Sequence, residues 1–152
     1  MLTVYALLKS IHILMAIIAL GANLSYPIWL YLGHKHERHV AFTLNGIKFL
    51  DDYIANPGYI LSLITGLGLC WYMHLNPFSV CWLWLSLILF ALAAGLGIGI
   101  YSPLLKKQIG ILNTEGKGSH AYKQINKNVM YIGLFICLLA LSIIFLMVSK
   151  PV

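Results

Sequence analysis

One histidine lies inside an apolar stretch that is long enough to cross a membrane. The stretch runs from Tyr5 to Tyr31 and contains His12. As a helix it would extend about 40 Å, with His12 about 12 Å from its outer end. A titratable side chain at that depth is costly without a partner, so the default interpretation is a functional site. Three alternative roles are open for His12. It is an axial haem ligand, a proton-relay or quinone-contacting residue, or a structural group that hydrogen-bonds a neighbour.

A haem iron bound by His12 would have few candidates for its second ligand. His74 is expected on the same side of the membrane, a few ångströms nearer the surface, and helix extension or tilt would close that gap. Polar or soft side chains at a similar depth are Thr65, Ser86 and Cys137. Without a second ligand the iron would be five-coordinate.

A second group of histidines follows the first apolar stretch. His34, His36 and His39 fall within six residues of a polar segment. Imidazole is a suitable ligand for zinc, copper or nickel, so this loop is a candidate metal-binding site. The spacing matches no closed metal site and supplies no fourth ligand, so a solvated basic turn is the alternative.

The cysteines indicate no zinc or redox motif. There are three, with no CxxC pair. Cys70 and Cys81 would lie on either side of a short turn and would form a disulfide in an oxidising compartment if their geometry allowed it. The sequence also lacks a Ser-His-Asp pattern, paired carboxylates within the apolar runs and a glycine-rich phosphate loop. Hydrolysis inside the apolar part of the chain is therefore not expected.

The composition is that of an integral membrane protein. The chain has 152 residues, of which 61% are hydrophobic and 9% charged, against about 25% charged in soluble domains. Four apolar runs, about 4–32, 57–75, 80–101 and 128–148, are each long enough to span a bilayer. We therefore predict an all-α four-helix membrane bundle, with residues 1–152 forming a single transmembrane domain.

The net charge of +6 comes mainly from two segments between the spans. Lys35, Arg38 and Lys48 lie between the first two runs, and a larger group lies between the last two: Lys106, Lys107, Lys117, Lys123 and Lys127. The positive-inside rule places both segments in the cytoplasm and both termini outside. We expect a multi-pass protein of a bacterial inner membrane, with lipid as its surroundings and no nucleic-acid partner. Aromatic residues expected near the cytoplasmic interface include Tyr59 and Tyr101.

An amphipathic cytoplasmic helix is predicted before the second span. Apolar residues recur every three or four positions from Val40 to Ile54, with Asp51 among the polar residues on the other faces. It would lie at the interface or run directly into the second span. Asn56-Pro57 would mark that junction, Pro103 would stop the third span, and Ser119 would cap a helix that leads into the fourth.

Small residues recur every fourth position in the second and third spans. The first set is Gly58, Ser62, Gly66 and Cys70, and the second is Ala91, Gly95 and Gly99. Such stripes allow helix backbones to approach closely in a membrane. We expect the second and third spans to pack together. A homodimer or a partner membrane protein is the alternative use of these faces.

Three stretches of the sequence resemble a known family. LLKSIHILMAIIALGANLSYP, NPGYILSLITGLGL and WLWLSLILFALAAGLGIGIYSPLLKKQ are similar to the first three spans of the domain of unknown function 2269 family of predicted integral membrane proteins. That family looks distantly akin to HemJ-type protoporphyrinogen oxidases and to the CopD copper-resistance membrane domain. The resemblance implies four membrane helices and a first-span histidine, here His12, that binds b-type haem. Ser86 stands where HemJ-type proteins have a functional lysine.

Three functional hypotheses follow. The leading one is a b-type haem protein, with His12 as ligand, that acts in electron transfer or HemJ-like porphyrin oxidation. The second is a non-catalytic membrane module that assembles with partners through its small-residue faces. The third is copper handling by the loop that contains His34, His36 and His39.

Overall fold

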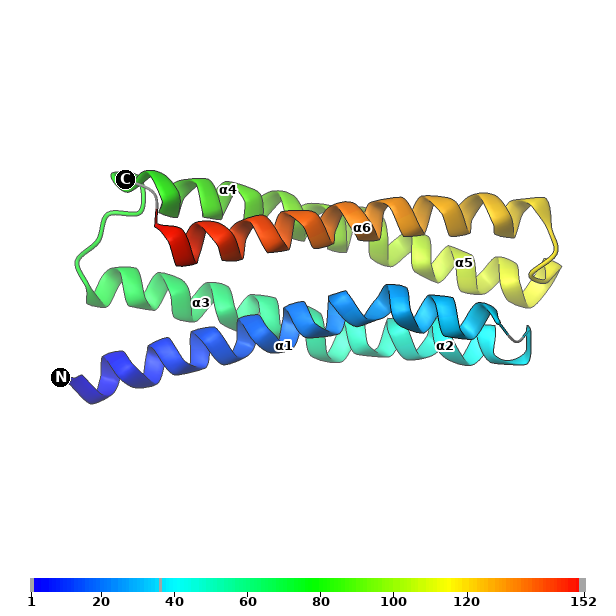
Figure 1. Ribbon diagram of the computed structural model, residues 1–152, viewed down its shortest axis with the longest axis horizontal. Coiled ribbons are helices and arrows are strands. Elements are labelled where there is room, and N and C mark those ends of the chain that lie inside the picture. Colours follow the sequence, from blue (N-terminus) through cyan, green and yellow to red (C-terminus); the bar gives the residue numbers. More distant parts are fainter. Residues whose placement is uncertain (1, 36, 151–152) are drawn as a thin grey trace.

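Four long helical segments form an elongated bundle (Figure 1). The computed structural model describes residues 2–35 and 37–150, and the regular elements in that part of the chain are all helices. In chain order they are α1 (Leu2–His34), α2 (Glu37–Leu50), η1 (Asp51–Ala55), α3 (Asn56–Tyr72), α4 (Cys81–Leu96), η2 (Gly97–Tyr101), α5 (Ser102–Glu115) and α6 (His120–Ser149). The elements η1 and η2 are π-helical turns. The chain is continuous through α2–η1–α3 and through α4–η2–α5.

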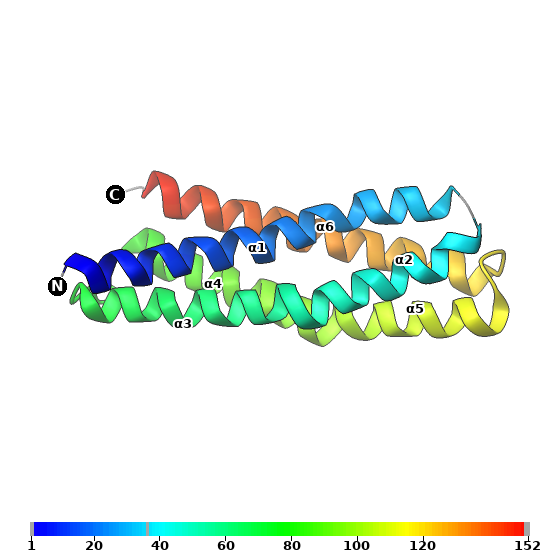
Figure 2. The same cartoon turned by 90° about the horizontal axis from the view of Figure 1, so that it is seen from below.

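The two ends of the bundle differ. Leu2, Ser149 and the 73–80 connection lie at one end, called the terminal end (Figure 1). The two basic connections lie at the other, called the basic end; Figure 2 shows α2 and α5 there. The segments contain 30 or more residues each and extend about 45–50 Å, more than the roughly 30 Å of a bilayer's hydrocarbon. The predicted membrane-spanning helices are confirmed. Which end faces the cytoplasm stays a prediction.

Two prolines follow the π-helical turns, and the helix continues through both. Proline has no N–H, and its ring crowds the carbonyl four residues earlier. In η1 the Asn56 N–H bonds the Asp51 carbonyl, and in η2 the Ser102 N–H bonds the Gly97 carbonyl, so both bonds reach back five residues. The widened turns let Pro57 and Pro103 enter the next helix without ending the segment. The prediction that Pro103 stops the third span is therefore wrong, since α5 continues the same segment to Glu115.

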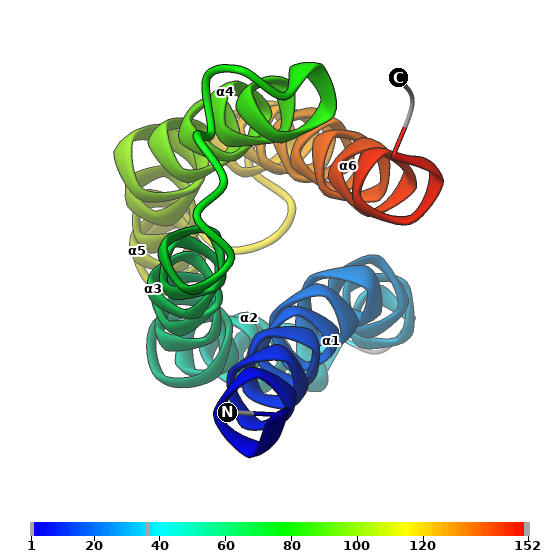
Figure 3. The ribbon, with the colours of Figure 1, turned by 90° about the vertical axis from the view of Figure 1, so that its left-hand side faces the viewer.

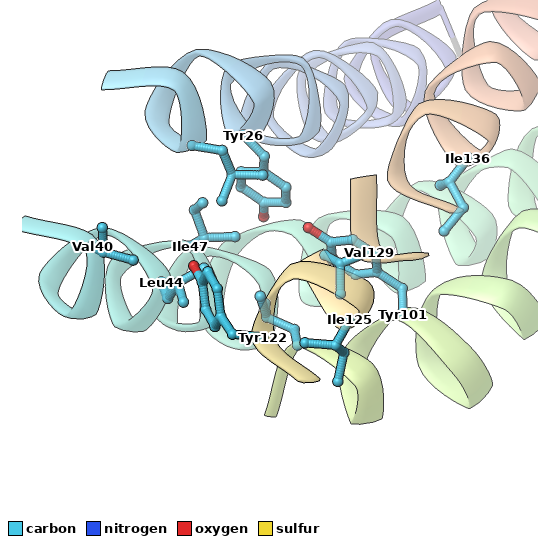
Figure 4. Close-up of a cluster of buried hydrophobic side chains, with 11 residues drawn as sticks. Tyr26, Val40, Leu44, Ile47, Tyr101, Tyr122, Ile125, Val129 and Ile136 are labelled. Carbon is cyan, nitrogen blue, oxygen red and sulfur yellow. The ribbon is translucent and has the colours of Figure 1, made fainter. Parts of the chain in front are cut away.

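The amphipathic helix before the second span is confirmed as α2, which runs directly into η1 and α3. Its apolar positions Val40, Leu44 and Ile47 are buried. They pack in one cluster with residues of α5 and α6, among them Leu105 and Tyr122 (Figure 4). The charged side chains that the structure describes in α2 and α5 lie on the other faces of these amphipathic helices. The buried apolar cluster therefore holds together the half of the bundle near the basic end. The sequence pattern did not reveal α5 as the counterpart of α2.

Toward the terminal end the helices pack in two pairs, α1 with α3 and α4 with α6 (Figure 3). The expected close packing between the second and third spans is wrong, because the backbones of α3 and α4 come near each other at hardly any point. The small residues of α3 face α1 instead. A Cβ atom on Gly58 would lie 3.1 Å from the Ala19 Cβ atom, and one on Gly66 would lie 3.0 Å from the His12 Cε1 atom.

Local signals near the connections are confirmed where the structure describes them. Ser119 caps α6, and its hydroxyl accepts a hydrogen bond from the Tyr122 backbone N–H at 3.1 Å. Gly116 ends α5 with a φ of 79°, a conformation that favours glycine. Cys70 and Cys81 are both free thiols.

A candidate ligand cavity between the helices

His12 joins α1 to α3 through its imidazole. Its Nδ1 atom lies 2.7 Å from the Ser62 carbonyl oxygen, and the hydroxyl oxygens of Ser62 and Thr65 are each 3.4 Å away. A carbonyl oxygen only accepts, so Nδ1 carries the hydrogen and Nε2 keeps its lone pair. The ring is half-buried against Gly66. This arrangement matches the structural use of His12 and also leaves one nitrogen able to bind a metal.

The other residues proposed for a haem site lie apart from His12. The Tyr5 and Tyr72 rings stack with centroids 6.3 Å apart, so the end of α3 is level with the first turns of α1. His74 follows that end and is exposed, about two turns from the level of His12. Ser86 is buried on α4, where its hydroxyl donates to the Trp82 carbonyl at 2.7 Å. Among the described residues no hydrogen bond joins His12 to His74 or to Ser86, and a haem site that includes all three stays a prediction.

The histidine loop is only partly described. His36 and the side chain of His34 lie outside the described residues, and the described His39 side chain is exposed. Among the described residues there is no group of three or more His, Cys, Asp or Glu side chains that could hold a metal ion. The metal hypothesis for this loop stays a prediction.

A cavity lies elsewhere in the bundle, at the level of the π-helical turns. It is a cavity of about 530 Å³ that side chains from all four helical segments line, within residues 23–31, 51–63, 90–101 and 126–143. This volume falls in the range typical of small-molecule sites, roughly 300–1,000 Å³. Most of the lining is apolar, as in Leu63, Phe90 and Ile136. The cavity extends from the turns toward the terminal end, between the α1–α3 and α4–α6 pairs.

A few polar side chains converge on this apolar space. Tyr26 is 4% exposed, and its hydroxyl has no hydrogen-bond partner in the part of the chain that the structure describes. Tyr101 is 5% exposed, and Figure 4 shows the hydroxyls of Tyr26 and Tyr101 directed toward the same space. The Asn23 amide donates to the Tyr59 hydroxyl at 2.5 Å. Asp51, 6% exposed, has the Asn56 side chain as its hydrogen-bond partner.

The π-helical turns help to place two of these groups. Asp51 begins η1 and Tyr101 ends η2, and both line the cavity. Gly133 of α6 leaves room for the Tyr101 ring, because a Cβ atom there would lie 3.1 Å from Tyr101 Cε2. Just outside, the Lys48 ammonium pairs with the Asp52 carboxylate and donates to the Ser102 hydroxyl at 2.8 Å.

Comparison with known proteins identifies the family. The family model described as "Predicted integral membrane protein (DUF2269)" matches residues 6–151. The chain belongs to this family. No curated protein and no solved structure matches the chain. The resemblance of this DUF2269 protein to HemJ-type oxidases and to CopD stays a prediction.

Several residues that line the cavity of this DUF2269 protein are also exposed. Tyr31 of α1 and Leu134 of α6 are two of them. Ile60 of α3 and Ile98 of η2 are two others. All four are large hydrophobic or aromatic side chains, which suit contact with lipid.

Sequence reasoning missed the residues that form this site. It placed Asp51 on a different face of the amphipathic helix from the apolar positions, and Tyr59 and Tyr101 in an aromatic belt, but the structure buries Asp51 and Tyr101 inside the bundle. The prediction for Asp51 is wrong because this residue follows the buried Leu44 and Ile47 by seven and four positions, a spacing that puts it on the same buried face of the helix. Tyr26 was detectable only as one more aromatic residue in an apolar helix.

Proposed function

We propose that this DUF2269 protein binds a lipophilic small molecule inside the membrane, in the cavity between its helical segments. The observation that carries the proposal is the hydroxyl of Tyr26, a residue that lines the cavity: this hydroxyl is buried and has no hydrogen-bond partner among the described residues. A buried hydroxyl without a partner costs about 1–3 kcal/mol. A ligand whose polar group hydrogen-bonds Tyr26, and whose apolar part fills the remaining space, recovers that energy.

The chemistry of the lining supports a partly polar ligand rather than a plain hydrocarbon. Sites for small molecules combine mostly apolar walls with a few convergent polar groups. Here Asn23, Tyr59 and Tyr101 add their polar groups to that of Tyr26. Tyr31 and Ile60 line the cavity and are exposed, so we expect such a ligand to enter beside them from the lipid without crossing the charged basic end.

Photolabelling with benzophenone tests this proposal. Benzophenone is uncharged and aromatic, has a carbonyl that accepts a hydrogen bond, and inserts into nearby C–H bonds when irradiated. We expect saturable labelling of buried lining residues, including Ile136, in protein held in uncharged detergent. Labelling at Phe145, which is 70% exposed and outside the cavity, should rise without saturating. If labelling of the lining never saturates, the proposal fails.

The Tyr26→Phe variant tests the hydrogen bond itself. It removes one hydroxyl and keeps the ring, so we expect the affinity for benzophenone to fall by about three- to tenfold, the value of one net hydrogen bond. Tyr131→Phe is the matched control, because Tyr131 is 70% exposed and does not line the cavity. Equal affinities for the two variants would show that the Tyr26 hydroxyl contributes nothing.

A second candidate is binding of b-type haem by His12. The hydrogen bond between Nδ1 and the Ser62 carbonyl favours it, because a carbonyl partner of this kind orients many metal-binding histidines and leaves Nε2 basic. The rest of the site does not fit. A porphyrin also needs an apolar space beside the ligand, and the cavity lining begins at Asn23, about 16 Å farther along α1.

The visible spectrum tests haem binding directly. Protein purified after supply of haem should show a Soret band if His12 holds the iron, and His12→Ala should abolish it. Thr65→Ala is the control, since it alters a neighbour of the ring without removing the ligand nitrogen. A colourless protein, or a band that His12→Ala leaves unchanged, would contradict this candidate.

Assembly with another membrane protein or a second copy is a third candidate. Ala91 and Gly95 of α4 and Gly99 of η2 are exposed on the outside of the bundle. A Cβ atom placed on Gly95 or Gly99 would have no neighbour within 4 Å. This face is therefore open to close approach by another helix, unlike the small residues of α3, which α1 already covers.

A further inference from the structure

We propose that the ligand of this cavity is a lipophilic cation whose positive group lies beside Asp51 among the tyrosine rings. The inference rests on the proposed function and narrows it to one class of ligand. It combines two independent observations: a buried carboxylate that has no ion-pair partner among the described residues, and aromatic rings around the same apolar space.

The charge of the cavity is the first observation. Among the described residues that line it, Asp51 alone carries a charged side chain. The nearby Lys48 ammonium forms its ion pair with Asp52 instead, and no ion pair of Asp51 occurs within the described part of the chain. The Asn56 amide provides one hydrogen bond to the Asp51 carboxylate. A buried carboxylate with this little compensation is costly, and a cationic ligand would neutralise it.

The aromatic rings are the second observation. Tyr26, Tyr59, Tyr101 and Phe90 all line the cavity, and the Tyr59 and Phe90 rings meet edge to face with centroids 6.2 Å apart. Aromatic faces attract organic cations, most strongly where water is excluded. The rings come from α1, α3, η2 and α4, so they border the space from several sides. Apolar walls toward the terminal end would hold the hydrophobic part of such a cation.

Two lipophilic ions of nearly equal size and opposite charge test the inference. Tetraphenylphosphonium and tetraphenylborate would each compete with benzophenone for the cavity, at pH 8 in uncharged detergent. We expect the phosphonium to compete at a concentration at least about tenfold lower, as suits a desolvated charge interaction. The net charge of +6 favours the borate over the whole surface, so a preference for the cation would have to come from the site.

Two single-charge variants locate that preference. Asp51→Asn should remove it, and an unfolding temperature in detergent close to that of the unmodified protein would show that the variant is folded. Asp52→Asn changes the charge of the protein by the same amount but lies outside the cavity lining, so the preference should persist. An equal effect of both variants would indicate long-range electrostatics and overturn the inference.

The remaining outcomes distinguish a failure of the cation inference from a failure of the proposal that the cavity binds a lipophilic molecule. Saturable benzophenone labelling with no preference between the two ions would overturn the cation inference and leave the binding function intact. Absence of saturable labelling would overturn the binding function itself. A preference that survives in Asp51→Asn would also overturn the inference, because the cation would then be recognised elsewhere.

Discussion

Gly58→Leu is expected to force α1 away from α3 and lower the stability of the protein more than any other single change considered above. A Cβ atom at position 58 would lie 3.1 Å from the Ala19 Cβ atom and 3.3 Å from the Met15 carbonyl oxygen. The carbonyl belongs to the helix backbone and cannot rotate away, so the leucine would separate the two helices. Overpacking of this kind costs about 3 kcal/mol. Thermal unfolding in detergent measures it.

Gly95→Leu is the matched control for this prediction. It introduces the same side chain on an apolar helix, at a glycine where an added Cβ atom meets nothing within 4 Å. Its unfolding temperature should stay close to that of the unmodified protein. If Gly58→Leu and Gly95→Leu unfold at the same temperature, the close α1–α3 packing does not hold the terminal half of the bundle together.

Filling the cavity is expected to abolish ligand binding without unfolding the protein. Ala93 and Ala140 line the cavity from α4 and α6. The double variant Ala93→Phe/Ala140→Phe places two phenyl rings in space that the ligand would occupy. We expect at least about a 100-fold loss of affinity for benzophenone, roughly 2.8 kcal/mol. Because the new rings bury apolar surface in an existing cavity, the unfolding temperature should not fall.

Ala91→Phe provides the control for cavity filling. Ala91 lies on α4 two residues before Ala93, but it is exposed and outside the cavity lining. Its binding curve should match that of the unmodified protein. Retention of binding in the double variant, with both rings in place and the protein folded, would show that the ligand sits outside this cavity.

Several features were predictable because they depend on short stretches of sequence. An apolar run longer than a bilayer is thick predicts a spanning helix regardless of its neighbours. The apolar repeat from Val40 predicted α2, and Ser119 predicted the start of α6. Each of these signals acts within a few turns of one helix, so no knowledge of the partner helix was needed.

The prolines show where local reasoning was insufficient. Proline disfavours the helix before it, so Pro103 was expected to end the third span. A π-helical turn removed the conflict, and α4 continues into α5 as one helical segment. The second turn ends at Tyr101 and sets the angular position of that residue. A change of register within a helix alters which face every later residue presents, so helical periodicity could not place the Tyr101 side chain.

By itself the amino-acid sequence determined the membrane class, the four spans, the amphipathic helix and an isolated polar group at His12. The tertiary structure alone decided that α3 packs on α1 rather than on α4, that His12 bonds the Ser62 carbonyl, and that a cavity lies among Tyr26, Asp51 and Tyr101. The physical reason is that hydropathy and helical period describe each segment against its solvent. A cavity instead forms where the side chains of several helices leave space between them. Its size and lining therefore depend on residues that are far apart in the chain.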